Sequence, residues 1–268
     1  MSYEALQVER DGPVLNVALN RPEVRNAMSP VMLAELAQAF GEARDNPEVR
    51  VLVLRGNGGV FSAGGDFRNM AKSDAARGAG VEETAASNRR FGTFLEMASV
   101  FPKALITLVE GPCMGGGVGL VAVSDWVIAE RGAQIGTPEV SIGIVPAQIT
   151  PFILERIGSA HGRRLTCFGL RLSAEEAMRI GLVHEVADGP QDLIVRGTAA
   201  VNQVLRCAPD AVAETKALVR LSQQVPLGET LDTASYMFAN ALAGEAKEGI
   251  AAFLEKRKPA WAAKIETL

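Results

Sequence analysis

The amino-acid sequence predicts an α/β core followed by a helical C-terminal region. Short apolar runs typical of buried strands recur along the N-terminal two thirds of the 268 residues. Glycine-rich turns separate these runs from helical patterns, as in sheets that are joined by crossover helices. From about residue 190 onward the periodicity is helical throughout. We therefore expect two units: an α/β core over residues 1–190, which carries the functional site, and a helical region over residues 191–268.

The elements of the core can be placed in order along the chain. Residues 14–20 alternate apolar and polar side chains, which indicates a half-buried strand. Ser29 and Pro30 then start a helix, because serine caps a helix N-terminus and proline suits the first helical position. Another helix is expected to open from the glycines at 115–117 and to include the apolar stretch after them. Further strands are expected at residues 51–54, 104–109 and 126–129.

Further helical signals lie between and after these elements. Ser173 and Glu176 have the spacing of a capping box, and Gly181 is suited to end the helix that this box begins. Residues 70–88 are small, polar and charged, so we expect them to form a mobile loop or a marginal helix beside the site. Three more helices are expected at residues 207–224, 231–243 and 245–256.

The composition argues against several classes of function. The formal net charge of −4 is unfavourable for a nucleic-acid partner, because such proteins need clustered excess lysine and arginine. No apolar run approaches the roughly 18 residues that a membrane span requires. The N-terminus lacks the basic and apolar regions of a signal peptide, and the three cysteines show no metal-ligand spacing. We expect a cytoplasmic protein with no nucleic-acid, membrane or metal partner.

Most standard catalytic motifs are absent as well. The sequence contains no GxGxxG, GK[ST], HExxH or GxSxG. His161 and His184 lie far apart in the sequence, and we expect both to be structural. Cys113 has no obvious base to activate it, so we expect a packing residue rather than a nucleophile.

Two glycine-rich turns remain as candidates for a site. Residues 61–66, Phe-Ser-Ala-Gly-Gly-Asp, follow one expected strand, and the glycines at 115–117 follow another. Glycine allows the backbone to approach a ligand closely, and the N–H groups at a helix start have no partner within the helix. Two such N–H groups that converge on one point would form an oxyanion hole. The alternative, from the residues alone, is that both turns are only tight connections.

With these turns the sequence resembles the crotonase (enoyl-CoA hydratase/isomerase) superfamily over nearly its whole length. No single motif is specific, but their order and spacing together are. The matching segments are Asn20–Pro22, Arg25–Ala27, Phe61–Asp66, Gly111 with Gly115–Gly117, Ser124–Asp125, Gly136–Glu139, Gly143–Pro146, Gly181–Val183 and Ala252–Arg257. The resemblance implies a crotonase-like spiral of ββα repeats with a C-terminal helical trimerisation region. It also implies that the protein is a homotrimer or a dimer of trimers.

The resemblance also implies roles for individual residues. The N–H groups of Gly65 and Gly116 correspond to the donors that hold the thioester oxygen, and Glu139 corresponds to a catalytic acid/base. Coenzyme A enters as part of an acyl-CoA thioester substrate, so no separate cofactor is expected. The residues implied to contact the substrate and its coenzyme A are Arg25, Ala27, Ala63, Gly64, Asp66, Phe67, Gly115, Pro138, Phe253 and Lys256. The last two are implied to reach coenzyme A across a subunit boundary.

One departure from the superfamily pattern bears on the reaction. Superfamily hydratases usually carry two glutamates, and the position of the first is Gly119 here. Members with a single carboxylate are frequently Δ3,Δ2-enoyl-CoA isomerases. However, residues 146–152, Pro-Ala-Gln-Ile-Thr-Pro-Phe, together with Gly-Val-Gly at 117–119, resemble the isohexenylglutaconyl-CoA hydratases, which lack the first glutamate. Gln148 within this segment is a polar departure that could orient water or the acyl group.

Our first expectation is therefore the hydration of an α,β-unsaturated acyl-CoA, of a branched, 3-substituted glutaconyl type, through an enolate held in an oxyanion hole. The first alternative is a Δ3,Δ2-enoyl-CoA isomerase that uses Glu139 as its single acid/base. The second alternative is a non-catalytic, CoA-binding homologue. The retention of Gly65, Gly116 and Glu139 favours an enzyme over this last alternative.

Overall fold

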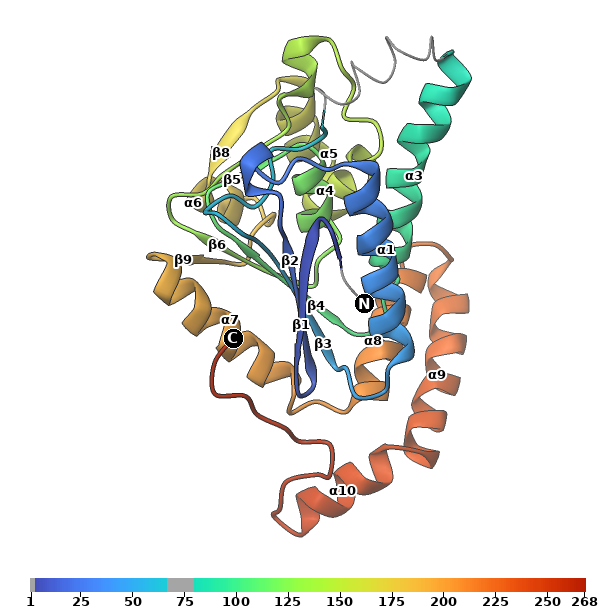
Figure 1. Ribbon diagram of the computed structural model, residues 1–268. Coiled ribbons are helices and arrows are strands. Elements are labelled where there is room, and N and C mark those ends of the chain that lie inside the picture. The colour runs from blue at the N-terminus through green and yellow to red at the C-terminus, as the bar shows by residue number, and fades with distance from the viewer. Residues whose placement is uncertain (1–2, 67–79) are drawn as a thin grey trace.

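The computed structural model of the chain describes residues 3–66 and 80–268. A six-stranded sheet of order β1-β2-β3-β4-β6-β9 runs through the centre of the molecule (Figure 1). β1 pairs with β2 in the antiparallel sense, and the other pairs of this sheet are parallel. Its strands are β1 (Leu6–Asp11), β2 (Val14–Leu19), β3 (Val51–Gly56), β4 (Ala104–Val109), β6 (Trp126–Glu130) and β9 (Glu185–Ala187). A smaller sheet of order β5-β7-β8 contains β5 (Pro112–Met114), β7 (Gln134–Gly136) and β8 (Arg171–Ser173).

Helices cover both faces of the large sheet. Those on one face are α1 (Pro30–Asp45), α3 (Val81–Ser99), α4 (Gly116–Ala122) and α5 (Thr150–Cys167), and α7 (Pro190–Val204) covers the other face. The remaining helices are α6 (Ala174–Arg179), α8 (Pro209–Leu221), α9 (Leu227–Ala243) and α10 (Ala246–Leu254), with short 3-10 helices η1 (Pro22–Val24) and η2 (Pro138–Ile142). α9 and α10 extend away from the sheet, at the right and the bottom of Figure 1.

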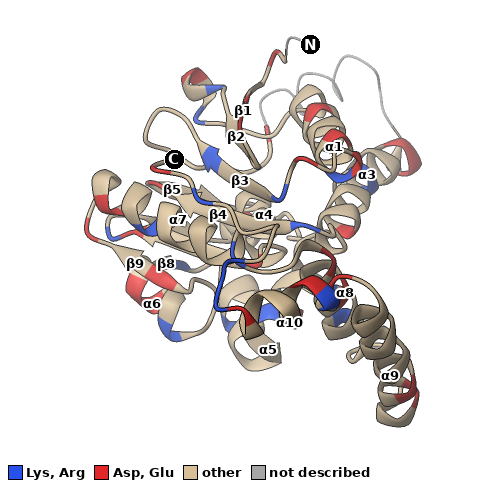
Figure 2. Cartoon of the chain, turned by 90° about the horizontal axis from the view of Figure 1, so that it is seen from below, with Lys and Arg blue, Asp and Glu red and all other residues tan. Residues whose placement is uncertain are grey.

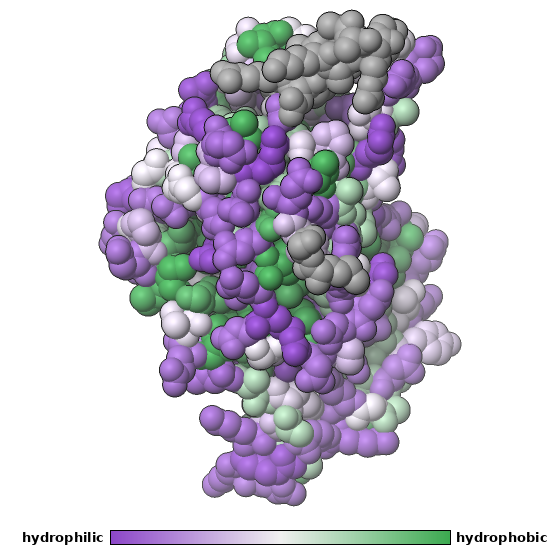
Figure 3. Space-filling view, in the orientation of Figure 1, coloured by the Kyte–Doolittle hydropathy of each residue, from purple (hydrophilic) through white to green (hydrophobic). Residues whose placement is uncertain are grey.

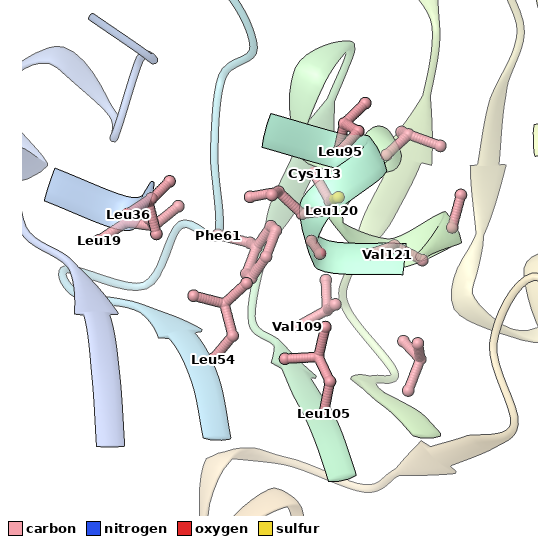
Figure 4. Close-up of a cluster of buried hydrophobic side chains, with 14 of the residues drawn as sticks. Leu19, Leu36, Leu54, Phe61, Leu95, Leu105, Val109, Cys113, Leu120 and Val121 are labelled. Carbon is pink, nitrogen blue, oxygen red and sulfur yellow. The ribbon is translucent and has the colours of Figure 1, made fainter. Parts of the chain in front are cut away.

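The core lies on both sides of the sheet, and β4 shows why its strands are continuous apolar runs. All six residues of β4 are buried. Leu105 and Val109 face the larger cluster, in which they pack near Phe61 and α4 (Figure 4). Ile106 and Leu108 face the opposite cluster, which α7 and the C-terminal segment complete. A strand covered on both faces has no solvent side, so it does not alternate between apolar and polar residues.

Most of the expected elements are confirmed. The strands expected at residues 14–20, 51–54, 104–109 and 126–129 are β2, β3, β4 and β6. α1 begins at Pro30, and Ser29 Oγ caps it by accepting a hydrogen bond from Met32 N at 3.2 Å. The capping box at Ser173 and Glu176 is present at the start of α6. The three helices expected after residue 207 are α8, α9 and α10.

The sequence analysis missed several strands and one helix start. β5, β7 and β8 have three residues each, which is too short for a periodic pattern to be recognised. β1 was not predicted either. Of the stretch expected as a loop or marginal helix, residues 81–88 form the first half of α3, where Glu82 and Glu83 stabilise the positive end of the helix dipole. Residues 70–79 lie outside the described part of the chain.

The C-terminal helices expose an apolar surface. In Figure 2, α9 projects from the rest of the molecule and carries few charged residues along its length. The large apolar side chains that α9 and α10 expose to between 44% and 81% are Leu227, Leu231, Tyr236, Phe238, Leu242, Ile250, Phe253 and Leu254. Within the described residues, no helix combines the length and the apolar character that crossing a bilayer requires.

Candidate active site

The two glycine-rich turns lie side by side in the structure. Ser62 N donates a hydrogen bond to Pro112 O at 3.1 Å, and Met114 N donates to Ser62 O at 2.9 Å, so the first turn is bridged to β5. On its other side, Met28 N donates to Gly64 O at 2.8 Å. These backbone hydrogen bonds hold together segments that are far apart in the sequence, and they fix the geometry of the site.

Glycine is required at two positions of these turns. Gly64 has a φ of 93° and Gly115 a φ of 51°, both in the region that favours glycine. A Cβ added at Gly64 would lie 3.1 Å from Met114 O, and one at Gly115 would lie 2.6 Å from Glu139 Oε1. The missing side chains therefore allow the two turns and the Glu139 carboxylate to approach one another.

The two N–H groups expected to form the oxyanion hole belong to these turns. Gly116 is the first residue of α4, so its N–H has no acceptor within the helix. Among the described residues, neither Gly65 N nor Gly116 N donates a hydrogen bond to a backbone carbonyl outside the regular elements or to a side chain. A Cβ at Gly116 would lie 2.9 Å from Met28 Sδ and 3.3 Å from the Phe91 ring, so apolar side chains border this N–H group. Both groups are available to a ligand oxygen.

Glu139 is a buried carboxylate beside these N–H groups. Pro138 begins η2, which carries Glu139 in its first turn, and the Glu139 residue is only 7% exposed. Its Oε2 is buried and has no hydrogen-bond partner among the described residues. Burial raises the pKa of this carboxyl above its ordinary value, while a hydrogen bond with its own backbone partly opposes the rise. A buried carboxylate with an unsatisfied oxygen is costly, and such groups are typical of sites that transfer protons.

This raised pKa predicts the pH dependence of activity. If Glu139 acts as a base, any reaction that depends on it requires a carboxyl that has lost its proton. Because burial raises the Glu139 pKa, we expect the acid limb of kcat/KM to lie above the 4.5 of an ordinary glutamate. A pH profile of kcat/KM measures this limb directly. An acid limb at or below pH 4.5 in the folded enzyme would contradict the assignment.

The next turn of α4 beyond Gly116 faces apolar side chains. A Cβ added at Gly119 would lie 2.6 Å from Ile149 Cγ2 and 3.2 Å from Leu95 Cδ1. Ile149 is 3% exposed and Leu95 is fully buried. Ile149 therefore occupies the space that a side chain at Gly119 would need, and no second acid reaches the site from this position.

Two groups that the sequence analysis set aside have structural surroundings. His184 Nδ1 accepts a hydrogen bond from Val127 N at 2.8 Å, which agrees with its expected structural role. Cys113 is fully buried, and burial raises the pKa of its thiol, so a reactive thiolate is disfavoured. Within the part of the chain that the structure describes, no three histidine, cysteine or acidic side chains gather as metal ligands.

A family model described as enoyl-CoA hydratase/isomerase matches residues 9–264. The chain belongs to the enoyl-CoA hydratase/isomerase family. It is 32% identical over 257 residues to the 2,3-dehydroadipyl-CoA hydratase of Escherichia coli, covering 95% of this chain and 97% of that protein. The structure of Pseudomonas aeruginosa AtuE is 47% identical with a TM-score of 0.94, covering 97% of this chain and all of that one. An enoyl-CoA hydratase/isomerase from Marinobacter aquaeolei is 44% identical with a TM-score of 0.92, covering 97% and 99%.

Several residues that the family resemblance assigns to coenzyme A binding lie around the first glycine turn. Ala63 N donates to Arg25 O at 2.8 Å, which joins the segment that contains Arg25 and Ala27 to this turn. Asp66 is 7% exposed and forms an ion pair with Arg21 at 3.1 Å. Arg21 Nη1 also donates to Ala27 O at 2.7 Å. In this family member Asp66 thus holds the turn in place through Arg21.

Phe253 and Lys256 are not brought to this site within one chain. Phe253 is on α10, and Lys256 lies just after it, at the opposite end of the molecule from α4 (Figure 1). Phe253 is 81% exposed. A single chain of this family enzyme therefore does not place either residue near Gly116. Phe67 lies outside the described residues.

The structure also shows site residues that the sequence analysis did not identify. Met28 and Phe91 border the Gly116 N–H group, and Ile149 closes the space beside Gly119. Asn26, in the matching segment at 25–27, is fully buried. Its Oδ1 accepts a hydrogen bond from Arg21 N, and its Nδ2 donates to Asn57 O and Val60 O, which ties its own loop to the loop after β3. Apolar side chains such as Met28, Phe91 and Ile149 look like ordinary core residues in a sequence, so no local signal distinguishes them.

Proposed function

We propose that the protein hydrates an α,β-unsaturated acyl-CoA through an enolate, with Glu139 as its acid/base. The observation that carries the proposal is the Glu139 carboxylate, buried with an unpartnered Oε2 directly beside the turn that presents the Gly116 N–H group. A CoA-binding homologue without activity would have no use for such a costly group. The proposed reaction uses no cofactor other than the coenzyme A of the substrate.

The proposed reaction needs only one acid/base. Glu139 takes a proton from water as the water oxygen bonds to the β-carbon. The π electrons move to the thioester oxygen, where the N–H groups of Gly65 and Gly116 stabilise the negative charge. The enolate then collapses, and its α-carbon takes the proton from Glu139. One water is added in total, and the Glu139 carboxylate is regenerated.

A second candidate is a Δ3,Δ2-enoyl-CoA isomerase. There Glu139 would take a proton from the α-carbon and return it to the γ-carbon, with the same oxyanion stabilised and no water consumed. The observation that favours this reaction is the contact of Ile149 and Leu95 with Gly119, which leaves no second acid on α4. The two candidates differ in whether water reaches the β-carbon, so product analysis separates them.

For the acyl group we propose a branched chain of the 3-substituted glutaconyl type, which ends in a second carboxyl group. A relative named for 2,3-dehydroadipyl-CoA, whose acyl group also ends in a carboxyl, supports this choice. The substrate's own carboxylate would supply charge that the protein lacks at Gly119. Simple linear enoyl-CoAs offer no such group.

We therefore predict that 3-methylglutaconyl-CoA is hydrated with a kcat/KM roughly tenfold or more above that of crotonyl-CoA, about the worth of one additional polar contact. Loss of absorbance of the conjugated thioester measures both rates, and isomerisation of 3-hexenoyl-CoA is followed in parallel. Fast isomerisation with no hydration of any branched substrate would establish the isomerase instead. Efficient hydration of crotonyl-CoA would show that the absence of an acid at position 119 does not limit the hydration rate.

We further propose that the protein assembles as a homotrimer or a dimer of trimers, in which Phe253 and Lys256 reach the coenzyme A of a neighbouring subunit. The exposed apolar side chains of α9 and α10 support this, because a surface of this kind is normally covered in an assembly. Figure 3 also shows a small apolar patch at the top of the molecule. Ile142 at the end of η2 and Val145 just after it are 62% and 73% exposed.

Sedimentation at micromolar concentration is expected to give the mass of a trimer or a hexamer. Phe238→Glu, which places a charge in the apolar face of α9, should shift the protein toward the monomer. Thr233→Glu, at an exposed polar position of the same helix, is the matched control and should leave the mass unchanged. A wild-type monomer that binds acyl-CoA with full affinity would contradict the shared pocket.

A further inference from the structure

The wall beside Gly116 and Gly119 of α4 is apolar, and its side chains come from α3, from the segment before α1 and from the segment before α5. Met28 and the Phe91 ring lie next to Gly116, and Ile149 with Leu95 lies next to Gly119 one turn further along α4. Water that adds to a β-carbon must be held in place by a polar group, because an unfixed water seldom has the correct distance and direction. These four side chains offer no such group.

The next residue along this wall is polar. Gln148 directly precedes Ile149, and its side chain crosses α3 at Gly92, the residue after Phe91. A Cβ added at Gly92 would collide with Gln148 Oε1. Gly92 is buried in the helix, so its missing side chain is what leaves room for the carboxamide. Gly92 and Gly119 together accommodate the neighbouring side chains of Gln148 and Ile149.

One hydrogen bond orients the Gln148 carboxamide, which can form further hydrogen bonds. Its Nε2 donates to Asn88 Oδ1 at 2.7 Å, and Asn88 lies one helical turn before Gly92 on the same side of α3. Among the described residues this is the one side-chain hydrogen bond of Gln148. The side chain is half-buried on α3, where Nε2 faces Asn88 and Oε1 lies against Gly92. Among the described residues no group donates a hydrogen bond to Oε1, so it can still accept one.

We propose that Gln148 is a positioning residue for hydration, in which Oε1 accepts a hydrogen bond from the water that attacks the β-carbon. Asn88 and the space at Gly92 hold the carboxamide for this task. Gln148 exchanges no proton: the water oxygen forms the new bond to carbon, and the proton that it loses goes to Glu139. This inference rests on the proposed hydratase function, because an isomerase positions no water.

The test compares two reactions of the same enzyme. Hydration of 3-methylglutaconyl-CoA needs a positioned water, whereas exchange of the α-proton of butyryl-CoA in D₂O needs only Glu139 and the oxyanion donors. Gln148→Met keeps the length of the side chain and removes its polar atoms. We expect kcat for hydration to fall by about 10- to 100-fold, the size of one lost hydrogen bond to a group that develops charge. The exchange rate should stay within about twofold.

Two further variants control this test. Asn88→Ala frees the carboxamide without removing it, so it should reduce hydration less than Gln148→Met does and again leave exchange unchanged. Gln191→Met makes the same substitution at an exposed position of α7 and should alter neither rate. If Gln148→Met fails to fold by circular dichroism, the Asn88→Ala variant decides the question, and unchanged hydration in it overturns the proposal.

The remaining outcomes are also decisive. Unchanged hydration in a folded Gln148→Met variant overturns the proposal, and so does an equal fall in hydration and exchange, which would indicate a structural role only. A wild-type protein that exchanges the α-proton but hydrates no enoyl-CoA would instead contradict the proposed hydratase function.

Discussion

Glu139→Gln is expected to lower kcat by about 10²–10⁴-fold, the usual contribution of a positioned acid/base, and to leave KM nearly unchanged. Glutamine has almost the same shape as glutamate, so it preserves the packing at η2 while removing the group that accepts the proton. Steady-state kinetics with 3-methylglutaconyl-CoA and isomerisation assays with 3-hexenoyl-CoA measure the effect on both candidate reactions. Undiminished kcat in both assays would remove Glu139 from the mechanism.

Glu139→Gln is also expected to change the thermal stability of the protein in a pH-dependent way. Because burial raises the Glu139 pKa in the folded state, the group favours folding at low pH, and this contribution is lost as the pH rises through the folded-state pKa. Glutamine stays neutral at every pH, so the variant does not bury a charge at high pH as the wild type does. Thermal unfolding should therefore show a higher Tm for Glu139→Gln than for the wild type at pH 8, with a difference that shrinks toward pH 4. A variant less stable than the wild type at pH 8 would speak against this account of the buried carboxylate.

Gly116→Pro is expected to reduce kcat by at least about 10²–10³-fold, the effect of losing one oxyanion donor. Proline has no N–H to donate, and Gly116 is the first residue of α4, a position at which the proline ring is compatible with the helix. Turnover of any substrate that the wild type accepts provides the measurement, because hydration and isomerisation pass through the same oxyanion.

Gly116→Ala is the matched control for this substitution. Both variants add a Cβ that meets Met28 Sδ at 2.9 Å, a contact that the flexible methionine can relieve, but alanine keeps the N–H group. We therefore expect the alanine variant to retain much more activity than the proline variant. Circular dichroism and acyl-CoA binding establish that both are folded. A folded proline variant with the activity of the alanine variant would refute the assignment of Gly116 as a donor.

Local patterns were sufficient to predict much of the fold. A continuous apolar run such as residues 104–109 implies a strand covered on both faces, and Ser29 and Ser173 mark helix starts through their own capping hydrogen bonds. The short strands β5 and β7 were missed because three residues show no period. They form because the turn after β4 and the one after β6 are held together by pairing across the chain, which no local pattern encodes.

For the site, the sequence by itself determined which chemical groups are present: two glycine turns, the Glu139 carboxylate and the absence of an acid at position 119. Only the tertiary structure decided their environment. The burial that raises the Glu139 pKa, the closure of the space beside Gly119 by Ile149, and the placement of Gln148 against Gly92 are contacts between distant segments. The physical reason is that a glycine, an isoleucine or a glutamine has the same local preferences in any protein. Whether it makes room, excludes water or orients it depends on the side chain that packing places opposite.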